Sequence, residues 1–188
     1  FGTPQNFFVF FAFLPKSFKQ YRDMTKEEAI VYMVDSNLDR TNILQSEKAK
    51  AYKMKMNALK AQGKRNDLTS SPLATKLDTA TLVGKEQGES RDQVYRYIKL
   101  NDLIPELLEM VDNSVLNEKP SIALRPAVEI SYLSKDEQEM LFNSIEYSDA
   151  TPSHAQAIKL RKESELNGLT EEFVENLMNE EKPNQITK

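Results

Sequence analysis

The stretch TATLVGKEQGESRDQVYRYIK, residues 79–99, decides the fold. A helix-turn-helix needs a small residue where its two helices cross, a glycine four positions later for the turn, and a branched apolar residue six positions further on. These places hold Gly84, Gly88 and Val94. The spacing predicts one helix before the turn and a second one, over 90–99, after it.

The second of these helices carries a polar face. If Val94 and Ile98 face inward, the polar side chains at its N-terminal end and along one side stay exposed, and one of its two tyrosines packs beneath it. Such a set suits the major groove, because Arg can hydrogen-bond guanine, Gln adenine and Asp cytosine. A helical hairpin with a solvated charged face explains the pattern alone equally well. The exposed residues are expected to be Ser90, Arg91, Asp92, Gln93, Tyr95, Arg96 and Lys99.

The sequence on either side is also helical in pattern. Thr25 and Glu28 have the spacing of a capping box, and apolar residues recur at helical intervals up to Asp39. A helix over 46–62 is expected to end at Gly63, and its exposed flanks are expected to carry Lys48, Lys50, Lys53, Lys55 and Lys60. Strand-like alternation is almost absent after Leu14, so we expect a mainly α fold. Further helices are expected near 72–76, 79–87, 104–111, 126–133, 135–146, 152–166 and 170–180.

The composition excludes much enzyme chemistry. The 188 residues include no Cys and one His, His154. A chain without Cys has no disulfide framework or thiol nucleophile, and one without a second His has no multi-histidine metal site. No apolar run approaches the roughly 20 residues of a membrane-spanning helix. We therefore expect no metal and no membrane, and a cytoplasmic location.

Charge is distributed unevenly along the chain. The net charge is −4, yet residues 48–76 contain eight basic residues and one acidic residue, whereas residues 163–188 contain seven acidic and two basic residues. With charges separated in this way, a protein whose net charge is negative can still have a basic surface that binds nucleic acid. A solvated helix face is the alternative explanation of the basic cluster.

Three stretches together resemble the central DNA-binding domain of ParB/Noc-type partition proteins. They are GESRDQVYRYIKLNDLIPELLEMVD (88–112), ALRPAVEISYL (123–133) and ATPSHAQAIKL (150–160). Upstream, EEAIVYMVDSNLDRTNILQSEKAKAYKMKMNAL (27–59) is similar to the end of the family's N-terminal domain and the helix that follows it. The family binds a centromere-like (parS-type) DNA site and helps to segregate chromosomes, plasmids or integrated elements.

The resemblance assigns roles to individual residues. Ser90 and Arg91 fall at the start of the family's recognition helix, where the Arg reaches DNA, and Gln93 and Arg96 fall on its exposed side. A turn near the DNA and a later helix that approaches the duplex add five candidate DNA contacts: Arg125, Ser153, Lys159, Arg161 and Lys162.

The nucleotide site of the family is poorly matched. Its members are CTP-dependent clamps with a Gly-rich motif and a Gly-Glu-Arg-Arg motif, and neither motif occurs here. In the third motif, Glu-Asn-x-x-Arg, Asn37 and Arg40 match, whereas Ser36 stands where the carboxylate belongs. Hard cations such as Mg²⁺ favour carboxylates. Asn37 and Arg40 are therefore the nucleotide-binding candidates, but we expect neither CTP hydrolysis nor a bound cofactor.

The resemblance implies the following organisation. Residues 1–20, which hold seven of the nine Phe, are assigned to no domain. A helical remnant of the ParB-like N-terminal domain and its linking helix (21–65) precede a multi-helix DNA-binding domain with a helix-turn-helix (66–182) and a polar tail (183–188), without the family's C-terminal dimerisation domain.

The implied function is sequence-specific binding of double-stranded DNA in chromosome or plasmid partition or nucleoid organisation. The chain is expected to be a homodimer, at least when on DNA, in the bacterial nucleoid, with a ParA-type ATPase as a further partner and no catalytic residues of its own. Two alternatives stay open, namely a CTP-dependent DNA clamp that hydrolyses CTP and a helix-turn-helix transcriptional regulator.

Overall fold

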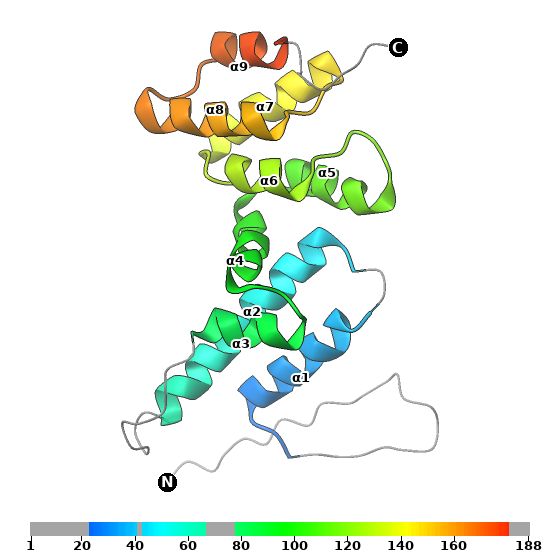
Figure 1. The fold of residues 1–188 in the computed structure, drawn as a ribbon, viewed down its shortest axis with the longest axis vertical. Helices are drawn as coiled ribbons and strands as arrows, with labels where there is room; N and C mark the ends of the chain where they lie inside the picture. The colour runs from blue at the N-terminus through cyan, green and yellow to red at the C-terminus, as the bar shows by residue number, and fades with distance from the viewer. Residues whose placement is uncertain (1–22, 41–42, 67–77, 181–188) are drawn as a thin grey trace. The chain divides into compact units, whose positions relative to one another are not determined.

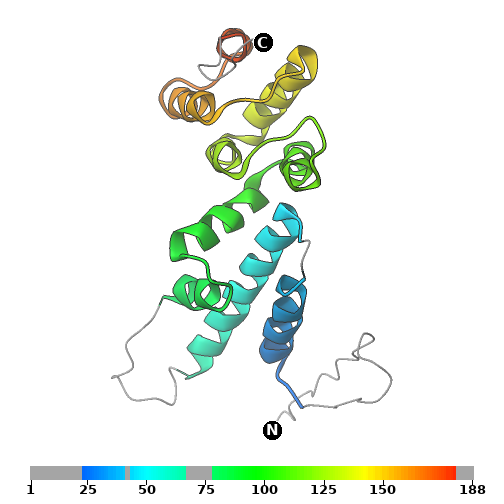
Figure 2. The ribbon, with the colours of Figure 1, turned by 45° about the vertical axis from the view of Figure 1, so that its right-hand side comes forward.

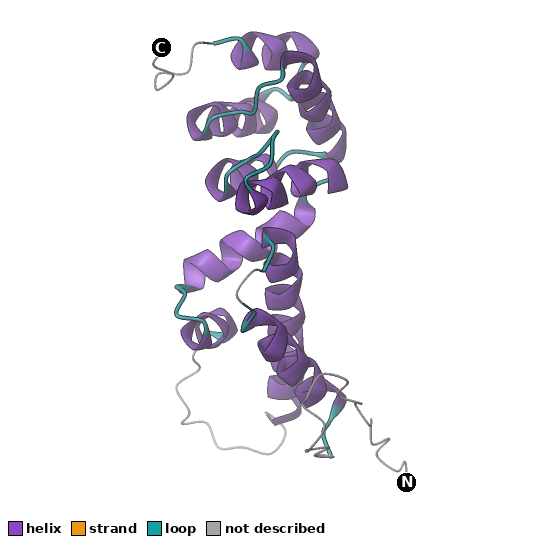
Figure 3. Cartoon of the chain, turned by 90° about the vertical axis from the view of Figure 1, so that its right-hand side faces the viewer, coloured by secondary structure: helices purple, strands orange, loops and turns teal. Residues whose placement is uncertain are grey.

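The computed structural model describes residues 23–40, 43–66 and 78–180, and every regular element in these ranges is a helix (Figure 1 and Figure 3). The expected mainly α fold is thereby confirmed. The elements are α1 (Lys26–Leu38), α2 (Gln45–Asn66), α3 (Thr79–Glu86), α4 (Arg91–Lys99), the 3-10 turn η1 (Leu100–Asp102), α5 (Pro105–Leu116), α6 (Leu124–Ile130), α7 (Lys135–Ser148), α8 (His154–Leu166) and α9 (Glu171–Met178).

The described helices belong to two compact units. Helices α1 and α3 and most of α2 belong to the first unit, which takes in residues 1–43 and 51–91. Helices α5 to α9 belong to the second unit, formed by residues 44–50 and 92–188, together with the start of α2 and nearly all of α4. No helix in the described ranges is long and apolar enough to span a bilayer.

Helix α1 starts as its sequence predicts. The Thr25 hydroxyl accepts a hydrogen bond from the Glu28 amide, and the Glu28 carboxylate accepts one from the Thr25 amide at 2.8 Å. The two residues thereby satisfy amide groups that the first turn of a helix leaves without partners. Val34 and Leu38 lie one turn apart and are buried.

Helix α2 does not end at Gly63, as predicted, but continues to Asn66. A glycine inside a helix costs about 1 kcal/mol relative to alanine. Ala, Lys and Gln residues surround Gly63, and these are strong helix formers that offset this cost. A single glycine is therefore a weak stop signal in such a segment.

Lys55 is buried, so its expected place on the exposed flank of α2 is wrong. Its side chain is 1% exposed, and Nζ donates hydrogen bonds to Asp35 of α1 and Glu86 of α3. Burial by itself lowers the pKa of Lys55, but these two carboxylates raise it above its usual value by hydrogen bonding and by charge. The charged lysine thus joins three helices of the first unit.

The turn between α3 and α4 is built on Gly88. Its φ of +67° is the left-handed conformation that glycine adopts without a steric penalty. The Glu89 amide closes the turn on the Gly84 carbonyl at 2.8 Å. The hydroxyl of Tyr52, a fully buried residue of α2, donates a hydrogen bond to the Glu89 carboxylate at 3.0 Å. The turn that the sequence predicts at Gly88 is present, and α2 holds it.

The second unit is a layered group of helices (Figure 2). In it α6 packs against α8, α7 against α9, and α5 against both α6 and α7. Each helix contributes apolar side chains spaced by three or four residues, which places them on one face. The fully buried members of this core include Leu107, Val111, Leu141, Ile145, Leu160 and Val174.

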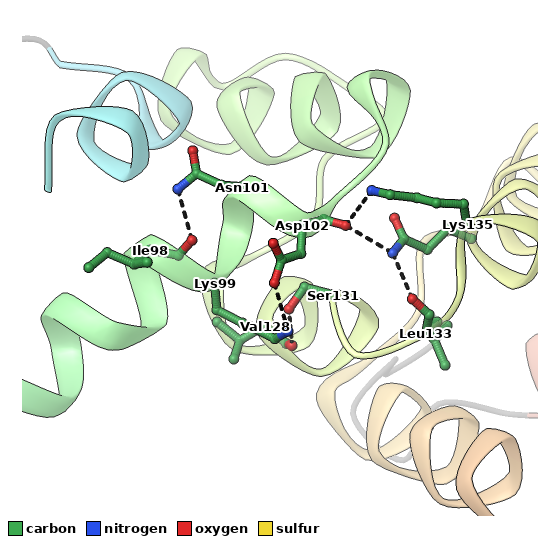
Figure 4. Close-up of polar contacts among 9 residues, drawn as sticks. Ile98, Lys99, Asn101, Asp102, Val128, Ser131, Leu133 and Lys135 are labelled. Carbon is green, nitrogen blue, oxygen red and sulfur yellow. Dashed lines mark hydrogen bonds and ion pairs between the residues drawn. The ribbon is translucent and has the colours of Figure 1, made fainter. Parts of the chain in front are cut away.

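A buried glutamine, Gln138, holds the segment that follows α4, in the region where Figure 4 labels Asp102, Leu133 and Lys135. The Gln138 side chain accepts a hydrogen bond from the Ile104 amide at 2.8 Å and donates to the carbonyls of Asp102 and Leu133 at 3.1 and 3.0 Å. Lys135 donates to the same Asp102 carbonyl at 2.6 Å. The segment between α4 and α5 is therefore fixed to the start of α7.

Glu137 joins three further segments of this unit. Its carboxylate accepts hydrogen bonds from the Ser134 amide at 2.8 Å, the Ser164 hydroxyl at 2.9 Å and the Leu169 amide at 3.0 Å. Partial burial raises the pKa of a carboxyl group, but these donors stabilise the charged form, so the pKa of Glu137 lies below its usual value. Glu137 thereby connects the N-terminal end of α7 with the end of α8 and the turn before α9.

The remaining helices lie where the sequence predicts them, with shifted ends. Helix α5 continues past the predicted end at residue 111 to Leu116, and α6 begins at Leu124, two residues before the predicted start. Helices α7, α8 and α9 agree with their predicted ranges to within two residues. The helix expected near 72–76 and the Phe-rich segment 1–20 lie outside the described residues.

Candidate nucleic-acid interface

Helix α4 has a buried and an exposed face, as its sequence predicts, although Ile98, expected to face inward, is only half-buried. Val94 and Tyr97 are buried, so Tyr97 is the tyrosine that packs beneath the helix. The Nζ atom of Lys48 lies 4.6 Å from the centre of the Tyr97 ring. A helix fixed along one side in this way can present its other side to a ligand. That side and the residue before it hold Ser90, Arg91, Asp92, Tyr95 and Arg96, which are exposed, and Gln93 and Lys99, which are half-buried.

Arg91, the first residue of α4, is held by a carboxylate. Its Nε donates to Asp78 Oδ2 at 2.6 Å, and both side chains are substantially exposed. Asp78 occupies the N-cap position of α3, where an aspartate side chain commonly accepts a helix amide, but it makes no such bond here. Its carboxylate is instead turned toward Arg91.

Gln93 and Arg96 form a pair on the outer side of α4. Nη1 of Arg96 donates to Oε1 of Gln93 at 3.2 Å, as the i, i+3 spacing allows. Tyr95 lies between them in sequence and is 38% exposed. The pair offers hydrogen-bond donors and an acceptor, and the Tyr95 ring lies about 100° around the helix from Arg96.

Lys99 and Arg161 come together on Tyr132, although 62 residues separate them in the chain. The Nζ atom of Lys99 lies 4.3 Å from the centre of the Tyr132 ring, and the guanidinium carbon of Arg161 lies 3.8 Å from it. Such cation–π contacts connect α4 and α8 through Tyr132, which follows the end of α6. Lys99 also forms an ion pair with Asp102 at 2.8 Å, drawn in Figure 4.

Arg161 is held by acidic neighbours. It pairs with Glu129 at 3.2 Å and with Glu165 at 2.8 Å. The hydrogen bond that Arg161 Nε donates to the Glu165 carboxylate is the main cause that raises the pKa of Arg161 above its already high value. A guanidinium held by two carboxylates and a tyrosine ring organises its surroundings, and only the N–H donors that these carboxylates do not engage remain for a phosphate.

The other candidates on α6 and α8 lie in different settings. Lys159 and Lys162 are exposed on α8, and Lys159 pairs with Glu180 at 2.6 Å. Ser153 caps α8, because its hydroxyl accepts a hydrogen bond from the Gln156 amide. Arg125 is exposed in the first turn of α6.

The nucleotide candidates lie at the end of α1. Asn37 and Arg40 are exposed, and the Arg40 amide donates to the Asn37 carbonyl at 3.3 Å. A cavity of about 550 Å³ beside α1 involves neither of them and is lined by Asp23, Met24, Glu28, Val31, Tyr32, Asp35 and Gln62. The charged residues of its described lining are Asp23, Glu28 and Asp35, and these carboxylates repel a triphosphate.

Two residues at the candidate interface were missed by sequence reasoning. Asp78 contacts Arg91, which lies 13 residues further along the chain. Tyr132 contacts Lys99 and Arg161, each at least 29 residues away in sequence. In the sequence, the Asp before Thr79 has the position of an ordinary helix N-cap. Nothing in the local pattern around Tyr132 indicates that two cations lie beside its ring.

No protein-family model, curated protein or solved structure matches this chain. Its own residues therefore have to carry the interpretation of the site.

Proposed function

We propose that this protein binds a specific double-stranded DNA site, as a ParB-type protein of chromosome or plasmid partition or nucleoid organisation. The observation that carries the proposal is the architecture of α4. The helix is fixed by Val94 and Tyr97 on one side, and on the other it presents side chains that hydrogen-bond base edges. The helix also follows a short turn built on Gly88. The residue spacing around this turn is the one that helix-turn-helix proteins have.

In this proposal the exposed residues of α4 read bases. Arg91 forks onto a guanine, Gln93 and Arg96 act as a pair, and Asp92 accepts from a cytosine. Tyr95 contacts a base or sugar at its edge. These contacts specify the sequence, whereas contacts with phosphates set the position of the protein on the duplex.

The phosphate contacts come from the DNA-binding candidates that do not belong to the base-reading face of α4. Lys159 and Lys162 of α8 and Arg125 of α6 are exposed cations of the second unit, and Ser153 offers a hydroxyl at the start of α8. Lys99 and Arg161, linked through Tyr132, offer further N–H donors, although Asp102, Glu129 and Glu165 offset their positive charge.

The proposed assembly is a homodimer on a two-fold symmetric site. Helix-turn-helix dimers bind two half-sites about one helical turn apart, so the symmetry of the protein appears in the DNA sequence. A ParA-type ATPase is the proposed partner in partition. We propose no catalytic activity for this chain, and the acidic lining of the cavity beside α1 argues against CTP binding there.

The test is selection of bound duplexes from a random DNA pool at two salt concentrations. We expect an inverted repeat to be recovered at both, because base contacts discriminate between sequences whereas phosphate contacts alone do not. Recovery of no motif, with binding that collapses as salt rises, would show a merely basic surface and contradict the proposal.

A further inference from the structure

We propose that Tyr52 and Lys55 of α2 are positioning residues for DNA recognition, because they hold the turn from which α4 begins. The inference rests on the proposed function, and it assigns part of the sequence specificity to two buried side chains outside the base-reading face. Its starting observation is that these two residues are 0% and 1% exposed and that both bind acidic residues at this turn.

The two attachments lie on either side of the glycine of the turn. Before Gly88, Lys55 Nζ donates a hydrogen bond to the carboxylate of Glu86, the last residue of α3. After it, the Tyr52 hydroxyl donates to Glu89 Oε2 at 3.0 Å. Tyr52 and Lys55 are three residues apart, which places them on one face of α2, and their two acidic partners are also three residues apart. Helix α2 therefore holds the chain at two points, one before and one after Gly88.

Gly88 is the place where the turn needs such restraints. Its φ is +67°, but glycine adopts other backbone conformations about as readily. The main chain itself supplies the hydrogen bond from the Glu89 amide to the Gly84 carbonyl. A change of conformation at Gly88 would move Ser90 and the first residues of α4, which are proposed to contact bases. The side-chain attachments on both sides of Gly88 therefore favour one position of these residues.

The attachments affect binding to a specific site more than binding to DNA in general. Affinity is reduced by the fraction of the protein that is in the binding-competent conformation, so a looser turn weakens the base contacts made by α4. The proposed phosphate contacts on α6 and α8 belong to the second unit, whereas the turn belongs to the first. Affinity that comes from phosphates alone should therefore change little.

The experiment measures the dissociation constants of Tyr52→Phe for the selected duplex and for a scrambled duplex. The substitution removes the hydroxyl and keeps the buried ring. We expect the preference for the selected duplex, which is the ratio of the two constants, to fall by about threefold or more. Lys55→Met removes the other attachment and should lower the same ratio. Chemical denaturation checks that each variant is folded.

Variants of Glu89 show whether the effect of Tyr52 is transmitted through the turn. Glu89→Gln keeps a side-chain oxygen that can accept the hydrogen bond from Tyr52, so we expect the preference to be retained. Glu89→Ala has no such acceptor, and its preference should fall. In a Glu89→Ala background, Tyr52→Phe should lower the ratio no further. A further fall of the same size would show that Tyr52 acts by another route and would contradict the inference.

Thr25→Ala is the matched control. It also removes a hydroxyl that takes part in a hydrogen bond of the first unit, with the Glu28 amide at 3.2 Å, but at the start of α1. A loss of stability alone lowers the amount of folded protein and changes both dissociation constants by one factor, so the ratio should stay unchanged. If Tyr52→Phe also leaves the ratio unchanged, the positioning role is wrong while the proposed function stands. If the unmodified protein shows no preference between the duplexes, the proposed function itself is wrong, and the inference fails with it.

Discussion

Several cations of the proposed interface are paired with carboxylates within the protein. Arg91 pairs with Asp78, Lys159 with Glu180, and Lys99 with Asp102. Exposed ion pairs of this kind contribute about 0–1 kcal/mol to stability. They can therefore be exchanged for a phosphate or a base edge at small cost. Binding by such residues depends on how well the DNA replaces the carboxylate, which favours sequences that offer a good acceptor.

Lys55 gives an asymmetric prediction for stability. Lys55→Met removes a buried charge and leaves Asp35 and Glu86 partly exposed, at 35% and 59%, where water can solvate them. We expect the free energy of unfolding to change by about 1 kcal/mol or less. The double variant Asp35→Asn/Glu86→Gln instead leaves a buried ammonium group without an acidic partner, and we expect a loss of about 3–5 kcal/mol. Chemical denaturation measures both.

A cost for Lys55→Met equal to that of the double variant would contradict this account. It would mean that the attraction between the lysine and its two carboxylates exceeds the cost of burying it by about 3–5 kcal/mol rather than by a small margin. Lys53→Met, at an exposed position of the same helix, controls for the loss of a lysine from α2.

Individual residues show where sequence reasoning ends. The buried side of α4 was predictable only in part, because Val94 follows from helical spacing and is buried, whereas Ile98, expected inside with it, is half-buried and Tyr97 is buried instead. The burial of Lys55 was not, because its two partners come from other helices and no local pattern distinguishes it from Lys53. The partners of Arg91 and Tyr132 are equally remote in sequence.

At the level of elements, Glu137 predicts a pH dependence of stability. Its pKa in the folded protein lies below the unfolded value near 4.5, so its contribution is present above that pH and is lost as pH falls through the folded pKa. At neutral pH we expect Glu137→Gln to lower the free energy of unfolding by about 1–2 kcal/mol, because it weakens hydrogen bonds to a charged group. The difference from the unmodified protein should shrink as the pH is lowered below about 4.5.

Urea denaturation over a range of pH measures this effect. Glu139→Gln is the control, since Glu139 is an exposed residue on the same helix. The account is contradicted if the difference in free energy of unfolding between Glu137→Gln and the unmodified protein stays constant down to low pH. The Gln side chain would then destabilise the protein for a reason other than its missing charge.

The helix starts were more predictable than the helix ends. Thr25 with Glu28 fixes the start of α1, and its capping box is present as expected. The end of α5 depends on Asn117, whose φ of +59° terminates the helix in the left-handed conformation. Asparagine is a weaker signal than glycine for this conformation, while Gly63 of α2, the stronger signal, lies within a helix. Packing and neighbouring residues decide such cases.

For the whole molecule, the charge distribution bears on specificity. The net charge of −4 disfavours unspecific attraction to DNA. Exposed basic residues such as Lys53 and Lys60 of α2 and Lys162 of α8 provide local positive potential. A uniformly basic protein gains most of its affinity from phosphate contacts, and this affinity falls as salt rises. A protein with few exposed cations makes fewer such contacts, so a larger share of its affinity comes from contacts with base edges.

The most direct test of the account compares Arg91→Ala with Lys162→Ala on two duplexes, the selected site and a scrambled sequence, at one salt concentration. We predict that Arg91→Ala weakens binding to the selected site by about 1–3 kcal/mol and changes binding to the scrambled duplex little. Lys162→Ala should weaken binding to both by the same factor. If Arg91→Ala also weakens binding to both duplexes equally, Arg91 contacts phosphate, and α4 does not read the DNA sequence.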